Sequence, residues 1–410
     1  MEKIKKLKKL FIKEKIDGYI IPKNDEFFGE YIPQHNDRLN YISNFSGSYG
    51  FALILKNKNY LFIDGRYTLQ ANNQSGGFFK IVTFPNKMPY DFIKKKLYIG
   101  FDPKLLTKKT LRIFFDNNLK YKPLKTNLVD KIWKRKIKNT KNAFYSLPER
   151  SIDNNYISKI NKVVLNLKKR KADYQFITAS ENNAWMLNIR GQDSEYTPIP
   201  HGYVLIDKLK NTSFFCDPKK ISHTLKRKLK KINFINIKFI DDYLFKINNK
   251  KFIIDRNSCS IYFEDLILKK NKILEYEDPI YFLKAIKNKK EIENIKKAHI
   301  DDGAALTKYI FWVKKNFNKK TITEISASNK LLELRKRNKK FKFLSFPTIS
   351  GTGPNGSIIH YKATKKTNRK LKKGDIYLVD SGGQYEFGTT DVTRTISLKN
   401  YNKRIKNIFT

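Results

Sequence analysis

The stretch DIYLVDSGGQYEFGTTDVTRT, residues 375–395, determines how the last third of this sequence is interpreted. Ile376–Val379 form a continuous apolar run, which predicts a strand that ends at Asp380, and the Gly-Gly pair at 382–383 predicts a turn. A second strand then brings Asp391 between two threonines. In a hairpin of this length, the two carboxylates can meet on one face, near the ends of paired strands.

Two ionised carboxylates side by side repel each other unless a cation lies between them. The pair therefore predicts a site for one or two hard or borderline divalent metals. The alternative, from the pattern alone, is a solvated hairpin whose aspartates cap turns. His360 in GSIIHY, predicted to lie one strand upstream, is the histidine that shares this acidic neighbourhood. Taken alone, a histidine at a strand end is more often a hydrogen-bonded structural residue. His299 lies on the apolar stripe of the preceding helix and is expected in the core.

The rest of the chain divides into blocks of alternating helical and extended patterns. A long helix is predicted over 291–317 and a second over 323–336, with Thr321 or Thr323 as its cap. The two preceding blocks, up to about Pro148 and from Tyr156 onward, both alternate in the manner of α/β domains. Their similar lengths suggest a duplication. The polar stretch at 121–155 predicts a linker between them.

Composition excludes several classes of protein. The 410 residues carry 85 Lys+Arg against 38 Asp+Glu, a net charge of +47, which raises nucleic-acid binding as a hypothesis. Lysine is used far more than arginine and is spread over every segment, so genome composition explains the charge better than a dedicated nucleic-acid surface. Only two cysteines, Cys216 and Cys259, occur, which excludes a disulfide scaffold. With no signal peptide and no apolar membrane span, a cytoplasmic protein is expected.

Motifs along the whole chain resemble the long, three-domain form of aminopeptidase P, the Xaa-Pro aminopeptidases of the creatinase-like, pita-bread metallopeptidases. The motifs, in order, are HNDRLNYISNFSGSYGFALIL at 35–55, FIDGRYTLQA at 62–71, NLVDKIW at 127–133, ENNAWMLNIRGQD at 181–193, AHIDDGAAL at 298–306, TEISA at 323–327, SFPTISGTGPNGSIIHY at 345–361 and the DSGGQY and GTTDVTRT pair.

The resemblance implies a fold class of α/β and α+β. Two creatinase-like α/β domains, 1–150 and 151–283, would precede the N-terminal half of a pita-bread catalytic domain at 284–410. It also implies an enzyme that removes an N-terminal residue when proline is second, with two divalent metals, usually Mn²⁺. Asp380 matches the first metal ligand and Asp391 the bridging carboxylate. His360 matches a histidine that contacts substrate near the scissile peptide, and Arg66 in DGRY matches a substrate contact from the first domain; no catalytic residue is expected beyond the metal site.

The sequence departs from the family pattern after Asp391. The remaining ligands, a histidine in an HGxGHGxG-type motif and two glutamates, do not occur. We therefore expect a C-terminally truncated chain with an incomplete pita-bread domain and metal site, inactive by itself. Unpaired edges are expected on strands 376–379 and 392–396, with Ile310 and Val313 left uncovered.

Two other functions remain open at this point: a non-catalytic pita-bread peptide-binding module, and a prolidase. The expected partners are Xaa-Pro peptides, with no specific nucleic acid and no membrane, and with a homodimer as an option for the full-length form.

Overall fold

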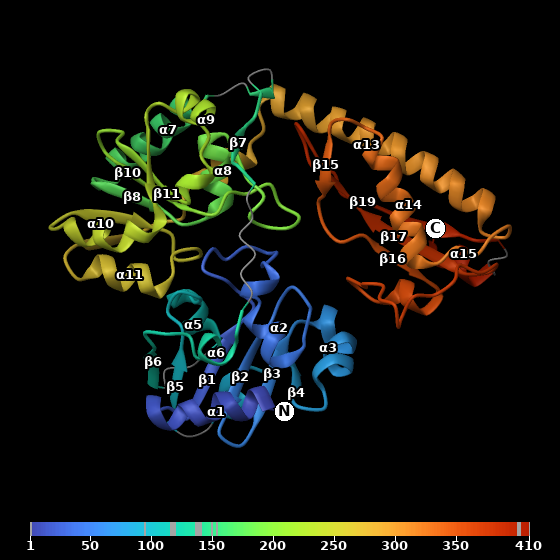
Figure 1. Cartoon of the computed structure of the whole chain (residues 1–410), viewed down its shortest axis with the longest axis horizontal. Coiled ribbons are helices and arrows are strands. Elements are labelled where there is room, and N and C mark those ends of the chain that lie inside the picture. Colours follow the sequence, from blue (N-terminus) through green and yellow to red (C-terminus); the bar gives the residue numbers. More distant parts are fainter. Residues whose placement is uncertain are drawn as a thin grey trace. The chain divides into compact units, whose positions relative to one another are not determined.

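The structure is a computed structural model that describes residues 2–93, 96–114, 120–135, 142–148, 151–152, 155–399 and 403–409. The chain divides into two compact units, which Figure 1 colours along the sequence. Unit 1 comprises Met1–Ser146 and Asn154–Ile286, and unit 2 comprises Leu147–Asp153 and Lys287–Thr410. Each unit is described by itself.

The first lobe of unit 1, residues 2–135, is a six-stranded mixed sheet covered by helices. Its first helix is amphipathic and buries Ile4, Leu7 and Phe11 against the sheet. The strands lie in the order β4-β3-β2-β1-β5-β6. They are β1 (Gly18–Pro22), β2 (Phe51–Leu55), β3 (Asn59–Ile63), β4 (Lys80–Thr83), β5 (Tyr98–Phe101) and β6 (Lys120–Pro123). The helices are α1 (Glu2–Glu14), α2 (Arg38–Ser43), α3 (Thr68–Ser75), α4 (Pro89–Phe92), α5 (Lys108–Phe114) and α6 (Leu128–Ile132).

The second lobe of unit 1, residues 145–146 and 155–286, repeats this arrangement. Its sheet order is β12-β11-β10-β8-β13-β14. The strands are β8 (Tyr174–Ile177), β10 (Tyr203–Asp207), β11 (Thr212–Cys216), β12 (Ile232–Asn236), β13 (Lys251–Ile254) and β14 (Lys272–Glu275), with a small ladder of β7 (Tyr145–Ser146) and β9 (Ile189–Arg190). The helices are α7 (Tyr156–Lys169), α8 (Ser180–Leu187), α9 (His223–Lys228), α10 (Ile240–Lys246), α11 (Ile261–Leu268) and α12 (Pro279–Ala285).

The two lobes share one topology. In each, a central strand pairs antiparallel with one neighbour and parallel with the other, β1 with β2 and β5, and β8 with β10 and β13. The hairpins β2-β3 and β10-β11 then extend through parallel edge strands β4 and β12. The duplication that the block lengths suggested is therefore present in the strand order.

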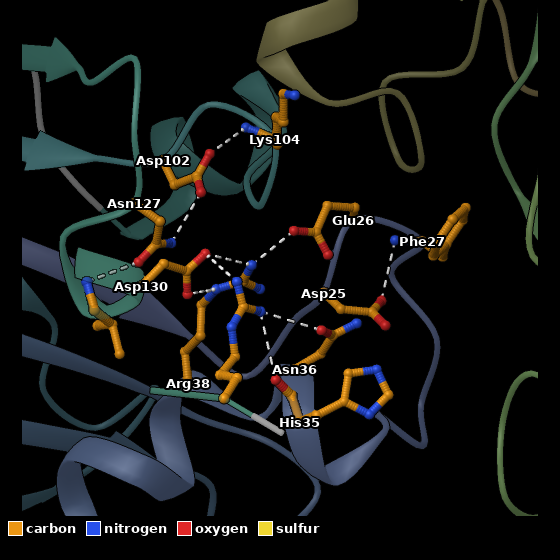
Figure 2. Close-up of polar contacts among 12 residues, drawn as sticks. Asp25, Glu26, Phe27, His35, Asn36, Arg38, Asp102, Lys104, Asn127 and Asp130 are labelled. Carbon is orange, nitrogen blue, oxygen red and sulfur yellow. Dashed lines mark hydrogen bonds and ion pairs between the residues drawn. The ribbon is translucent and has the colours of Figure 1, made fainter. Parts of the chain in front are cut away.

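The linker prediction for 121–155 is wrong over its first part. Strand β6 and helix α6 belong to the first lobe, because Leu128 and Val129 are fully buried in its core. Figure 2 shows why the polar residues of this stretch belong to the fold: Arg38 lies between the carboxylates of Glu26 and Asp130, at 2.7 and 2.9 Å. In the sequence alone, a polar residue such as Asp130 is typical of a linker, because its buried arginine partner lies far away in the chain. Residues 136–141 lie outside the described residues.

The lobes of unit 1 meet through contacts from the loop after β1. The Phe27 ring stacks on the His201 ring with centroids 4.2 Å apart, and the Tyr203 hydroxyl donates to the backbone oxygen of Glu26 at 2.7 Å. Farther along this joint, the Ser194 hydroxyl donates to a backbone oxygen of the same loop at 2.8 Å. Cys216 and Cys259 are both buried free thiols. Within the described ranges, no helix is long and apolar enough to cross a membrane.

Asp278 predicts a pH dependence for the stability of unit 1. It is the N-cap of α12 and is buried, where it accepts from Asn182 at 2.7 Å and Gln175 at 3.3 Å. Burial, reinforced by Asp255, raises the pKa of Asp278 to about 6. Because the folded state then holds this proton more tightly than the unfolded chain, stability rises as pH falls from 7 through 6 and levels off below about 4.

We expect this component to be on the order of 1 kcal/mol between pH 7 and pH 5. It is measured by comparing guanidinium unfolding of the wild type and Asp278→Asn at the two values. The asparagine keeps an oxygen that can cap α12 but does not titrate, so the variant should lack the pH dependence that Asp278 contributes. Equal pH dependence in the two proteins would contradict the prediction.

Unit 2 packs two long helices against a three-stranded antiparallel sheet of order β16-β17-β19. In Figure 1 this sheet lies beside the long orange helix α13. Tyr309 and Val313 of α13, Leu331 of α14, and Tyr377 and Val379 of β17 share one core. The helices are α13 (Lys289–Asn316), α14 (Glu324–Lys336) and α15 (Lys403–Phe409). The strands are β15 (Phe341–Leu344), β16 (Ile349–Thr352), β17 (Ile376–Ser381), β18 (Gly383–Tyr385) and β19 (Val392–Ser397), with a 3₁₀ turn η6 (Gly353–Ser357) after β16.

Several local predictions for unit 2 can be compared with this structure. Helix α14 starts where predicted, and the Thr323 hydroxyl caps it by accepting from the Ser326 N–H. The expected unpaired edge on 376–379 is wrong, because β17 is the central strand with a partner on each side. Val313 is fully buried and Ile310 is packed against the same core, so neither lacks cover.

Candidate metal centre

Strand pairing brings the carboxyl groups of Asp380 and Asp391 together. In the antiparallel ladder, Asp380 lies opposite Thr393 and Ser381 lies opposite Val392, so Asp391 immediately precedes the paired segment. The buried positions of β17 alternate, which places Asp380 on the face opposite the helical core. The two carboxyl groups are within hydrogen-bond reach of each other. Partial burial, together with the like charge of Asp380, raises the pKa of Asp391.

The turn prediction at Gly382 is wrong, although a glycine is needed there. The chain continues from β17 into β18, which pairs with β15, and it turns only beyond Tyr385. A Cβ on Gly382 would lie 2.0 Å from the backbone oxygen of Thr390 and 2.2 Å from the Ser345 hydroxyl. The Gly383 N–H also donates to the Thr390 hydroxyl at 2.9 Å. This close packing fixes the residue immediately before Asp391 against the end of β17.

The carboxyl pair fits a divalent cation. The Oδ1 atom of Asp380 is buried without a hydrogen-bond partner. An acceptor in that position lacks a positive partner, and a cation bound by oxygen ligands supplies one. Within the part of the chain that the structure describes, no group of three or more His, Cys, Asp or Glu side chains could hold a metal. The described residues would therefore contribute a pair of carboxylates to such a site.

His299 lies close to this pair and was missed by the sequence interpretation. The prediction that it is a core residue is wrong, because its side chain is exposed on α13. Its Nδ1 contacts the backbone oxygen of Ile295 at 2.9 Å, and its charge lowers the pKa of Asp391 against the two effects that raise it. The buried stripe of α13 runs through Ala298 and Asp302, so His299 is rotated out of the core.

A fully buried ion pair between Asp302 and Arg335 contacts the end of β17, at the residue after Asp380. The Arg335 Nε donates to Asp302 at 2.7 Å, and both side chains have no exposed surface. Arg335 Nη2 also donates to the Ser381 hydroxyl at 3.0 Å, and the Tyr385 hydroxyl donates to Asp302 at 2.7 Å. Helices α13 and α14 are thereby tied to the junction of β17 and β18. The sequence signal was an aspartate on an apolar helix stripe, four positions after Ala298.

His360 does not lie on a strand, contrary to the sequence interpretation. Residues after η6 form a turn in which His360 is exposed and adopts a left-handed backbone conformation, with φ +56°. Its neighbour Tyr361 donates to the Glu324 carboxylate, which also accepts from the N–H of Thr352 at the end of β16. Thr352 lies opposite Tyr377 of β17. Asp380 lies three positions farther along β17. The structure thus brings the two aspartates together and holds His360 on a separate turn.

Arg66 lies in unit 1, on the 3₁₀ turn η2 (Gly65–Tyr67) that follows β3. Its guanidinium makes a two-pronged contact with the Asp64 carboxylate, with Nη2 at 2.7 Å and Nε at 3.0 Å. The hydrogen bond to Asp64 raises the pKa of Arg66. The side chain is 41% exposed, so this fixed, permanently charged fork is open to solvent.

Comparisons with known proteins cover nearly the whole chain. Two models described as "Creatinase/Prolidase N-terminal domain" match residues 3–124 and 135–291, and "Metallopeptidase family M24" matches residues 293–410. "Probable Xaa-Pro aminopeptidase P" of Laccaria bicolor is 35% identical over 415 residues, covering 96% of this chain and 64% of that protein. The protein of the same description from Paracoccidioides lutzii is 33% identical, covering 95% of this chain and 68% of that protein.

A solved structure shows the same fold. The crystal structure of X-prolyl aminopeptidase from Caenorhabditis elegans, described as "a cytosolic enzyme with a di-nuclear active site", superimposes with a TM-score of 0.91 at 26% identity. The match covers 98% of this chain and 70% of that chain. The expected fold class, two creatinase-like domains followed by a pita-bread domain, is confirmed. The chain spans about two thirds of the length of these relatives. By sequence and by fold, it belongs to the Xaa-Pro aminopeptidases of metallopeptidase family M24.

Proposed function

We propose that the protein carrying this chain is a metal-dependent aminopeptidase that releases the N-terminal residue from peptides with proline at the second position. The observation that carries the proposal is the Asp380 and Asp391 pair, with one buried carboxylate oxygen left unpartnered. Family membership supplies the substrate class, because the relatives are described as Xaa-Pro aminopeptidases.

Asp380 and Asp391 would hold divalent metal, and we propose two ions, with Mn²⁺ preferred. When bound, such ions supply Lewis-acid chemistry: they stabilise negative charge that develops on a carbonyl oxygen and make water a better nucleophile. The chain's own contribution is to keep the two carboxylates adjacent before any ion arrives. The ladder between β17 and β19 and the packing at Gly382 perform that task.

His360 and Arg66 are proposed as substrate contacts. An imidazole on an exposed turn has two ring nitrogens that can donate to or accept from a peptide group. The partly exposed positive charge of Arg66, held in place by Asp64, suits an acceptor such as a carbonyl or carboxylate oxygen. A cytosolic location is part of the proposal and follows the description of the Caenorhabditis elegans neighbour. A homodimer is proposed as well, and light scattering would test it.

Product analysis tests this function. Protein expressed from the complete reading frame that contains these residues is incubated with an Xaa-Pro-Yaa tripeptide, an Xaa-Ala-Yaa tripeptide and an Xaa-Pro dipeptide. We expect mass spectrometry to show release of the first residue from the Xaa-Pro tripeptide, loss of activity with a chelator, and recovery with Mn²⁺. Cleavage of the dipeptide alone would indicate a prolidase, and binding without cleavage would indicate a peptide-binding module; either result contradicts the proposal.

A further inference from the structure

Glu324 is the first residue of α14, and its side chain is completely buried. Its carboxylate accepts hydrogen bonds from four donor groups. Such a charge is costly to bury unless donors surround it. Here the donors come from separate segments of unit 2. They are the Thr352 N–H at 2.9 Å, the Asn355 amide at 3.0 Å, the Tyr361 hydroxyl at 2.9 Å and the Arg369 N–H at 3.0 Å.

These donors lie at both ends of the segment 353–369 and within it, and this segment contains His360. Thr352 ends β16 just before the segment, and Arg369 ends it; the Glu324 N–H donates in turn to the Arg369 oxygen at 3.0 Å. Within the segment, Tyr361 is the direct neighbour of His360 and is buried. The Tyr361 hydroxyl also contacts Thr367, at 3.0 Å from its side chain. One carboxylate therefore anchors the segment at its start, at its end and next to His360.

The backbone of His360 needs such an anchor. With φ +56°, it occupies the left-handed region, which costs energy for a residue with a Cβ and persists only where surrounding contacts impose it. The hydrogen bond from Tyr361 to Glu324 restrains the backbone one residue after His360. Burial raises the pKa of Tyr361 to about 12, so at neutral pH the hydroxyl keeps the proton that it donates.

We propose that Glu324 is a positioning residue for His360: its carboxylate, acting through Tyr361, holds the turn that presents the imidazole to a peptide substrate. This inference rests on the proposed role of His360 as a substrate contact. A glutamine at position 324 would keep the side-chain length and one accepting oxygen, but its NH2 group would replace the other. At the Oε2 position the NH2 group would face the donors of Tyr361 and Arg369, and at the Oε1 position it would face the Thr352 N–H. The segment would then lose one of its two acceptor oxygens and the negative charge, while β16, β17 and β19 keep their ladder.

The structural arm of the test uses the 410-residue chain and hydrogen exchange measured by mass spectrometry. In Glu324→Gln we expect exchange in 353–369 to accelerate at least about tenfold, with protection of 376–381 unchanged. Tyr361→Phe, which removes a single donor, should show a smaller effect in the same segment. Ser350→Ala is the matched control, because the Ser350 hydroxyl contacts the backbone oxygen of Glu324 at 2.8 Å and leaves its carboxylate untouched. Equal acceleration in 353–369 and 376–381 would show general destabilisation and overturn the inference.

The functional arm uses the complete reading frame and an Xaa-Pro tripeptide. We expect kcat/KM to fall by about 10- to 100-fold in His360→Ala and by a similar factor in Glu324→Gln, because a displaced contact costs about as much as a missing one. The double variant should lose no more than His360→Ala alone, and Ser350→Ala should resemble the wild type. Additive losses, or an active Glu324→Gln enzyme beside an inactive His360→Ala enzyme, would overturn the inference.

The two proposals fail in different ways. If the wild-type protein hydrolyses no Xaa-Pro peptide, the proposed function is wrong, and hydrogen exchange still decides whether Glu324 holds the turn. If the enzyme is active and His360→Ala has no effect on kcat/KM, the function stands and the positioning role is refuted.

Discussion

Asp391→Asn is expected to remove divalent-metal binding and Xaa-Pro hydrolysis together. The substitution keeps the size of the side chain and removes one of two adjacent negative charges, and an amide is a much weaker ligand for a hard cation than a carboxylate. Because metal chemistry of this kind supplies several kcal/mol of transition-state stabilisation, we expect kcat/KM to drop by at least about a thousandfold. Metal content by mass spectrometry and peptide hydrolysis are measured on the same preparation.

A folding defect can be separated from the loss of the site. Without metal, Asp391 and Asp380 repel each other, and this repulsion contributes to the raised pKa of Asp391, so the metal-free variant should be at least as stable as the metal-free wild type. Glu386→Gln, which removes one negative charge from the turn between β18 and β19, is the control and should bind metal normally. Normal metal stoichiometry in Asp391→Asn would refute the assignment of Asp391.

Arg335→Met is expected to destabilise unit 2 by about 3–5 kcal/mol, because it leaves the Asp302 carboxylate buried without its cationic partner. The free energy of unfolding is measured in guanidinium chloride. The double variant Arg335→Met with Asp302→Leu should recover much of the loss, since it removes both charges from the interior.

A surface pair on the same helix provides the control for the buried pair. Arg337, the C-cap of α14, lies 2.7 Å from Glu333, but both side chains are more than half exposed, so Arg337→Met should cost far less than Arg335→Met. A cost below about 1 kcal/mol for Arg335→Met would mean that water or another group compensates Asp302. Because Arg335 also donates to Ser381, the destabilising variant should weaken metal binding at Asp380 next to it.

The elements predicted best are those that depend on local sequence. The period of apolar residues located α13 and α14, and Thr323 marked the start of α14 because a threonine side chain caps a helix locally. The spacing of Asp380 and Asp391 anticipated their contact, since β17 and β19 pair antiparallel although β18 lies between them in the chain. Their role as metal ligands stays a prediction.

The errors come from contacts between distant segments. His299 was placed in the core because it was assigned to the apolar stripe of the helix. In the structure it lies one residue from the buried Ala298, and the rotation of the helix between successive residues turns its side chain out of the core. SIIHY looked like a strand because β-branched residues precede His360, but the hydrogen bonds to Glu324 impose a turn instead. The pair of Asp302 and Arg335 joins residues 33 positions apart, and no local pattern specifies which charges will meet.

The repeated strand order of unit 1 has a consequence for how the chain folds. Each lobe contains one hairpin closed by a short connection, β2 to β3 and β10 to β11, whereas its other pairings join strands farther apart in the chain. Short loops close first, so we expect each hairpin to form early and to act as the template for the parallel strands on its outer edge. Two templates with the same topology in one chain can compete for each other's strands. Synthesis from the N-terminus reduces that competition, because the first lobe can complete its sheet before the second hairpin leaves the ribosome.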